Sequence, residues 1–123
     1  MPAVDPTSEF IRSTFRSVWA LELLCFLRQH AGGSVAHHTM VTELWGSDAV
    51  VTQSLGALTA AGLVVTEADG AARYAPVSAD LDRLAADAAA AYRRSPDAVR
   101  RLIVIAANPG ITAFADAFRL RKD

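Results

Sequence analysis

Residues 47–74 read SDAVVTQSLGALTAAGLVVTEADGAARY, and this stretch decides the fold. Ser47 is a favourable N-cap, and Asp48 suits the positive end of a helix. Gly62 can take the positive φ that ends a helix. Three apolar residues between them recur at the spacing of one buried helical stripe, namely Val51, Leu55 and Leu58. Together these signals predict a helix over residues 48–61.

The residues after Gly62 predict a β-hairpin. Residues 63–66 are apolar or β-branched, as is typical of a strand. Asp69-Gly70 lies where a tight turn is needed, and residues 72–74 can return as the second strand. The stretch therefore encodes a capped helix, a glycine stop and a hairpin.

Upstream of this stretch, residues 8–30 predict one long N-terminal helix that ends at Gly32-Gly33. Ser34-Val35 can form a short strand against the hairpin. Residues 36–45 predict a second helix that faces the core with Met40, Val41, Leu44 and Trp45. The main apolar face of the long helix comprises Phe15, Val18, Trp19, Leu23, Phe26 and Leu27. Four further apolar residues fall partly outside that face, namely Phe10, Ile11, Leu21 and Leu24.

Downstream, residues 79–121 predict C-terminal helices. Ser78 or Asp80 can cap a helix that continues through Arg94. Ser95-Pro96-Asp97 supplies a cap, a first-turn proline and a first-turn acid, so a new helix begins there. A last helix is predicted over residues 111–121.

A helix, a short turn with Gly46, a second helix and a hairpin resemble a winged helix-turn-helix domain. The resemblance is to bacterial transcriptional regulators of the MarR or ArsR-like type and covers about residues 32–76. It implies a mainly α fold with a small β-hairpin wing, an N-terminal helix and C-terminal helices. The residues that carry the shared pattern are Val51, Leu55, Leu58, Gly62 and Leu63.

Length and composition predict a single domain over residues 1–123. The chain is 52% hydrophobic and 20% charged, which is typical of a globular protein. Because Cys25 is its only cysteine, the chain cannot form an internal disulfide, and we expect Cys25 to be a small buried side chain of the core. No apolar run is long enough to span a bilayer and no signal peptide is evident, so we expect a cytoplasmic protein.

The charges are unevenly distributed along the chain. Residues 1–78 carry four arginines against seven acids, whereas residues 79–123 carry eight cations against six acids. Between Arg28 and Arg73 there is no lysine or arginine. The same interval holds four acids, namely Glu43, Asp48, Glu67 and Asp69. This pattern opposes ordinary DNA binding, in which cations neutralise phosphates.

The resemblance implies that the chain is a DNA-binding regulator of transcription. One helix of residues 48–61 would enter the major groove of each half-site, and the wing would contact the flanking DNA. Thr52 and Gln53 can contact base edges or phosphate, and Arg73 on the wing can enter a minor groove. Phosphate contacts are expected from two basic clusters, namely Arg93, Arg94, Arg100 and Arg101. An alternative is that these arginines form a solvated helix face paired with nearby aspartates.

A second function is a protein-protein interaction module with an acidic surface and no DNA binding. In regulators of the resembled type, flanking helices often form a dimer interface, so we expect a C2 homodimer held by the N-terminal and C-terminal helices. The alternative is that those helices only cover the monomer core.

Three kinds of chemistry find little support in the sequence. His30, His37 and His38 lack the spacing of a metal-ligand set, so no metal or cofactor is expected. Trp19, Trp45, Phe26, Phe114 and Phe118 could line an effector pocket, but aromatic residues at helical spacing are more often core. No catalytic motif is present, and we do not expect an enzyme.

Overall fold

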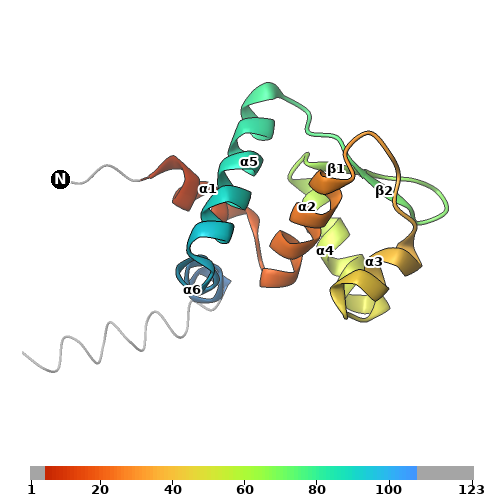
Figure 1. The fold of residues 1–123 in the computed structure, drawn as a ribbon, viewed down its shortest axis with the longest axis horizontal. Coiled ribbons are helices and arrows are strands. Elements are labelled where there is room, and N and C mark those ends of the chain that lie inside the picture. The colour runs from red at the N-terminus through yellow and green to blue at the C-terminus, as the bar shows by residue number, and fades with distance from the viewer. Residues whose placement is uncertain (1–4, 108–123) are drawn as a thin grey trace, which may run out of the picture.

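The computed structural model describes residues 5–107, and within them the fold is mainly helical with one small antiparallel sheet (Figure 1). The elements in chain order are α1 (Pro6–Thr14), α2 (Val18–Gln29), α3 (His37–Leu44), α4 (Asp48–Ala60), β1 (Val64–Thr66), β2 (Ala72–Tyr74), α5 (Ala79–Arg94) and α6 (Pro96–Ala107). The helix predicted over residues 111–121 lies outside the described residues.

Helix α2 lies at the centre of the molecule. It packs against α3, α4 and β2 on one side and contacts α5 and α6 on the other. Helices α1, α5 and α6 pack together as a second layer (Figure 1). Four leucines of α2 are almost completely buried between the two layers, namely Leu21, Leu23, Leu24 and Leu27. Each such side chain stabilises the fold by roughly 1.5–3 kcal/mol through the apolar surface that it removes from water.

The single N-terminal helix predicted over residues 8–30 is wrong, because the chain breaks at Phe15 and forms α1 and α2 instead. Phe15 is extended, with φ −100° and ψ 121°, and the hydroxyl of Ser17 caps α2 by accepting the Ala20 N–H. The break changes the direction of the apolar side chains. Phe10 and Ile11 are therefore buried, although a continuous helix would place them partly outside.

The prediction for the segment around residues 47–74 agrees closely with the structure. Ser47 caps α4 by accepting the Val50 N–H, and Val51, Leu55 and Leu58 are buried. In the hairpin, Val65 pairs with Arg73, and the Asp69 carboxylate accepts the Ala71 N–H. Val35 forms an isolated bridge to Ala72, as predicted for a short strand against the hairpin.

The side chains of α3 and of the turn that follows it depart from the prediction at one residue. Trp45 was expected to face the core together with Met40, and Met40 is indeed fully buried. The Trp45 side chain is 91% exposed. It follows the last residue of α3 in a left-handed conformation, with φ 54° and ψ 33°, and this conformation turns the indole away from the core.

Ends of the C-terminal helices agree with the sequence signals. Ser78 caps α5 by accepting the Leu81 N–H, and Pro96 is the first residue of α6. The chain between β2 and α5 is held to the end of α4, because the Val77 N–H donates to the Gly62 carbonyl at 2.9 Å. This contact fixes where α5 begins relative to α4.

Two glycines of the same segment provide a matched stability test. Gly62 has φ 79°, and a Cβ there would lie 3.0 Å from a Val77 methyl carbon. Gly56 lies inside α4 with open space around a built Cβ. We expect Gly62→Ala to lower the unfolding free energy by about 1–3 kcal/mol, and Gly56→Ala to raise it by roughly 0.5–1 kcal/mol. Urea denaturation measures the unfolding free energy of both variants. Equal midpoints for the two would contradict the distinction between a glycine required for its positive φ and a glycine inside a helix.

Candidate binding surface

The exposed side of α4 carries the two residues predicted to contact base edges. Thr52 and Gln53 both lie on the solvent side, opposite the buried stripe. Hydrogen bonds from neighbouring elements hold the helix in place. The Nε2 atom of His37, in the first turn of α3, lies 3.1 Å from a carboxylate oxygen of Asp48, in the first turn of α4. This bond joins the first turns of the two helices.

A groove of about 550 Å³ runs between α4 and the hairpin. Its walls are mostly small or apolar, and its charged group is the carboxylate of Glu67. The Ser34 hydroxyl donates a hydrogen bond to that carboxylate, so the groove side of the hairpin is tied to the chain before α3. The lining residues are His37, Thr52, Leu55, Gly56, Thr59, Ala60, Thr66, Glu67, Ala68 and Gly70.

Arg73 is exposed but does not face this groove. Successive residues of a strand alternate between the two faces of a sheet. Ala72 is buried and Thr66, its partner in the register, lines the groove, so Arg73 lies on the opposite face of the hairpin. The structure therefore brings Thr52 to the groove and leaves Arg73 outside it.

The four other predicted DNA contacts lie far from α4 in the fold. Arg93 and Arg94 end α5, while Arg100 and Arg101 belong to α6. Helix α6 packs on α1 and α5, whereas α4 packs on α2, α3 and β1 (Figure 1). Within one copy of the chain, these arginines and the exposed side of α4 do not form one surface.

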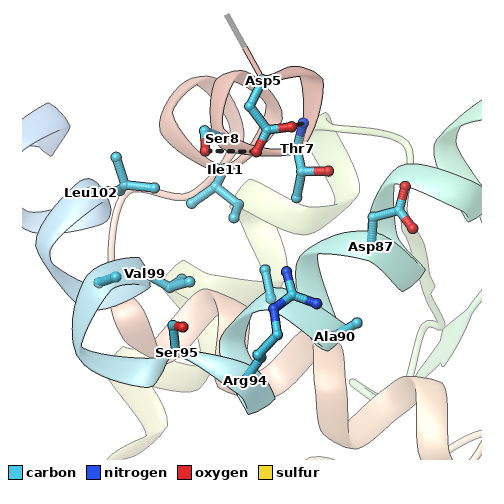
Figure 2. A pocket seen from close by; sticks show the side chains of 12 residues that line it. Asp5, Thr7, Ser8, Ile11, Asp87, Ala90, Arg94, Ser95, Val99 and Leu102 are labelled. Carbon is cyan, nitrogen blue, oxygen red and sulfur yellow. Dashed lines mark hydrogen bonds between the residues drawn. The ribbon is translucent and has the colours of Figure 1, made fainter.

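Some of these arginines have partners within the described residues. Arg100 donates to Asp97 at 3.1 Å, and its guanidinium lies 5.4 Å from the centre of the Tyr92 ring. Contact with Tyr92, followed by the Asp97 charge, raises the pKa of Arg100. Arg94 points into a cavity of about 340 Å³ between α1, α5 and α6 (Figure 2). Arg100 thus makes one of the aspartate contacts that the alternative of a solvated helix face expects.

The cavity that Arg94 lines also contains groups with structural roles. Asp5 accepts from the Thr7 N–H at 3.3 Å and from the Ser8 hydroxyl at 3.1 Å, and so caps α1 (Figure 2). Asp87 from α5 lies on another wall. Two carboxylates and one guanidinium therefore line the cavity together with the apolar side chain of Ile11. We assign it no binding role.

Two tyrosine hydroxyls tie the C-terminal helices to the rest of the fold. Tyr74 of β2 donates to Asp82 of α5 at 2.6 Å, and Tyr92 of α5 donates to Glu22 of α2. Burial, followed by the hydrogen bond to Asp82, raises the pKa of Tyr74 to about 12. Burial and Glu22 likewise raise the pKa of Tyr92. Both phenols are therefore neutral donors at physiological pH.

The histidines are dispersed. The Nδ1 atom of His30 lies 3.0 Å from the Phe26 carbonyl oxygen, His37 contacts Asp48, and His38 is exposed. Within residues 5–107, no three histidine, cysteine or acidic side chains gather closely enough to hold a metal ion. In the same part of the chain, every helix is too short or too polar to cross a lipid bilayer.

Aromatic residues do not line a shared effector pocket in the described part of the chain. Trp45 points to solvent, Trp19 is 39% exposed, and Phe26 is half-buried against the core. Phe114 and Phe118 lie outside the described residues. The sequence pattern did not reveal that two tryptophans would be exposed, because their spacing is also that of core residues.

No protein family, no curated protein and no solved structure matches this chain.

Cys25 is half-buried on α2 beside a small cavity that Arg28 and Arg93 also line. Burial, followed by the Glu22 charge, raises the pKa of its thiol to about 11 from 9.0, against the opposing effect of the two arginines. A raised pKa lowers the fraction of reactive thiolate.

We expect a disulfide reagent at pH 8 to modify Cys25 about a hundredfold more slowly than an unperturbed thiol, because its pKa is about two units higher. Unfolding in guanidinium should restore the ordinary rate, which serves as the internal control. Rapid modification of Cys25 in the folded protein at pH 8 would contradict the raised pKa of its thiol.

Proposed function

We propose that this chain is a winged helix-turn-helix regulator of transcription that binds double-stranded DNA through α4 and the hairpin. The observation that carries the proposal is the order of its central elements. Helices α2, α3 and α4 are followed by a hairpin, and the chain before α3 bridges to that hairpin. Such an arrangement presents the exposed side of the last helix to a major groove and the hairpin to the adjacent minor groove.

Within this proposal, Gln53 reads a base edge and Thr52 contacts a phosphate or a thymine methyl group.

The regulator acts as a homodimer in this proposal. Helices α1, α5 and α6 form a layer on the side of α2 away from α3 and α4. A dimer formed through that layer leaves both copies of α4 free to contact two half-sites. It also gives Arg93, Arg94, Arg100 and Arg101 a place near the dimer axis, where DNA curving toward the protein would meet them.

Sedimentation of the purified chain tests the dimer directly. We expect a mass of twice 13.1 kDa at micromolar concentration. A single species at the monomer mass over the whole concentration range would contradict the proposed dimer, whatever the outcome for DNA.

A protein-interaction module is a second candidate, and the charge of the α4 and hairpin surface favours it. Glu43, Asp48, Glu67 and Asp69 are all exposed, whereas the cation of this region, Arg73, lies on the outer face of the hairpin. Strand β1 also lies at an edge of the sheet, since β2 pairs with β1 on one side and with Val35 on the other. An open edge beside an acidic groove can accept a basic segment of a partner protein.

Selection from genomic DNA fragments at low and moderate salt separates the two candidates. For the regulator, we expect enrichment of a shared inverted repeat. Gln53→Ala should weaken binding to that repeat by about tenfold and relax its sequence preference, because one bidentate base contact is worth roughly 1–3 kcal/mol.

Arg73→Ala should instead weaken binding to all sequences and reduce the slope of log affinity against log salt by about 1. Arg83→Ala is the matched control, because Arg83 is an exposed residue of α5 that pairs with Asp80. Absence of any enriched sequence at low salt would reject the regulator and favour the protein module.

A further inference from the structure

Trp45 combines two unfavourable features at one position. Its side chain is 91% exposed. It is also the one residue other than glycine with a positive φ in the described part of the chain. A left-handed conformation is costly for a residue with a Cβ, and glycine or asparagine is usual at this position after a helix. Strain of this kind that persists in a fold indicates a function for the residue.

The surrounding structure holds Trp45 in this conformation. Its N–H donates to the Thr42 carbonyl at 3.3 Å, and the next N–H, of Gly46, donates to the Val41 carbonyl at 3.2 Å. These bonds end α3 with a left-handed cap. The backbone at this turn is therefore fixed, and the indole is displayed on a rigid support.

Gly46, the residue after Trp45, lies beside two further apolar side chains. A Cβ built on Gly46 would lie 3.8 Å from a ring carbon of Trp19 and 3.7 Å from a Val50 methyl carbon. Trp19 is itself 39% exposed, and Val50 is half-buried. We call Trp19, Trp45, Gly46 and Val50 the tryptophan surface. Exposed tryptophans beside small apolar residues are typical of the energetic centre of protein interfaces.

The tryptophan surface is separate from the groove beside the hairpin. Side chains two positions apart on a helix differ in direction by about 200° around the helix axis. Val50 therefore lies on the flank of α4 opposite Thr52, which lines the groove. A partner on the tryptophan surface would leave the groove accessible, so the inference does not require that the chain bind DNA.

Charge indicates the chemistry of the partner. Glu43 is exposed two residues before Trp45, and Asp48 is exposed three residues after it, in contact with His37. The interval from residue 29 to residue 72 has no lysine or arginine. The face of an indole attracts a guanidinium or ammonium group, and a nearby carboxylate strengthens that preference. An acidic segment would find no cation of this interval to pair with, and the exposed cation nearest in sequence to the tryptophan surface is Arg16, three residues before Trp19.

We propose that the tryptophan surface is a docking site for a partner protein segment that presents arginine or lysine beside an apolar side chain. The partner's cation lies over the Trp45 indole near Glu43, and its apolar side chain packs against Trp19 and Val50.

The test uses the full-length protein and two labelled peptides of equal length, one of alternating leucine and arginine and one of alternating leucine and glutamate. Fluorescence anisotropy should show binding of the arginine peptide that is at least tenfold tighter than that of the glutamate peptide. Trp45→Ala should weaken binding of the arginine peptide about tenfold, and Glu43→Gln two- to threefold. Val77→Ala is the control, because Val77 is 76% exposed outside this surface.

Trp45→Gly separates a binding role from a structural one. Glycine adopts a positive φ without strain, so the melting temperature of this variant should rise while its affinity for the arginine peptide falls. Equal binding of that peptide by the wild type and either Trp45 variant would overturn the proposal. It would also be overturned if both peptides bound equally, or if Trp45→Ala only abolished self-association or DNA binding.

Discussion

The packing of α2 against α4 is the contact on which the rest of the structure depends. The buried leucines of α2 meet the stripe of Val51, Leu55 and Leu58, and this contact holds α4 with its polar side toward solvent. Because α2 also contacts α5 and α6, the same helix joins the α4 and hairpin unit to the second helical layer. Loss of a leucine from α2 would therefore weaken both layers, at a cost of about 2–5 kcal/mol for a Leu→Ala change at a fully buried position.

Local signals in the sequence were sufficient for most of the fold. Ser47, Gly62 and Ser78 each act within a few residues, by capping a helix or by taking a positive φ. Ser47 and Gly62 appear in the structure as predicted, and Ser78, one of two predicted caps, caps α5. The break between α1 and α2 was missed although Ser17 offered a cap. The apolar residues on both sides of it suit one continuous helix as well as two, and only their packing against α5 and α6 distinguishes these arrangements.

The candidate site was less predictable, because its features depend on contacts between distant parts of the chain. Helical periodicity places Thr52 and Gln53 on the exposed side of α4, but it gives no information on where α6 lies relative to α4. The clusters around Arg93 and Arg100 were thus identified as basic without any indication that the fold separates them from α4. The prediction that Trp45 faces the core is wrong for a different reason. Its apolar side chain suggested burial, whereas the left-handed turn after α3 displays it to solvent.

The separation of charge within the fold constrains any function of the chain. Cations at the end of α5 and on α6 lie in the helical layer, and exposed acids lie on the α4 and hairpin unit. Within residues 5–107, a single copy therefore offers a polyanion no continuous basic face that includes α4. In the dimer proposed through α1, α5 and α6, the arginines of both copies would lie near the dimer axis, between the two copies of α4. In the proposed regulator, DNA bound by both copies of α4 would cross these arginines, whereas recognition of a basic segment by one α4 and hairpin unit would need one copy alone.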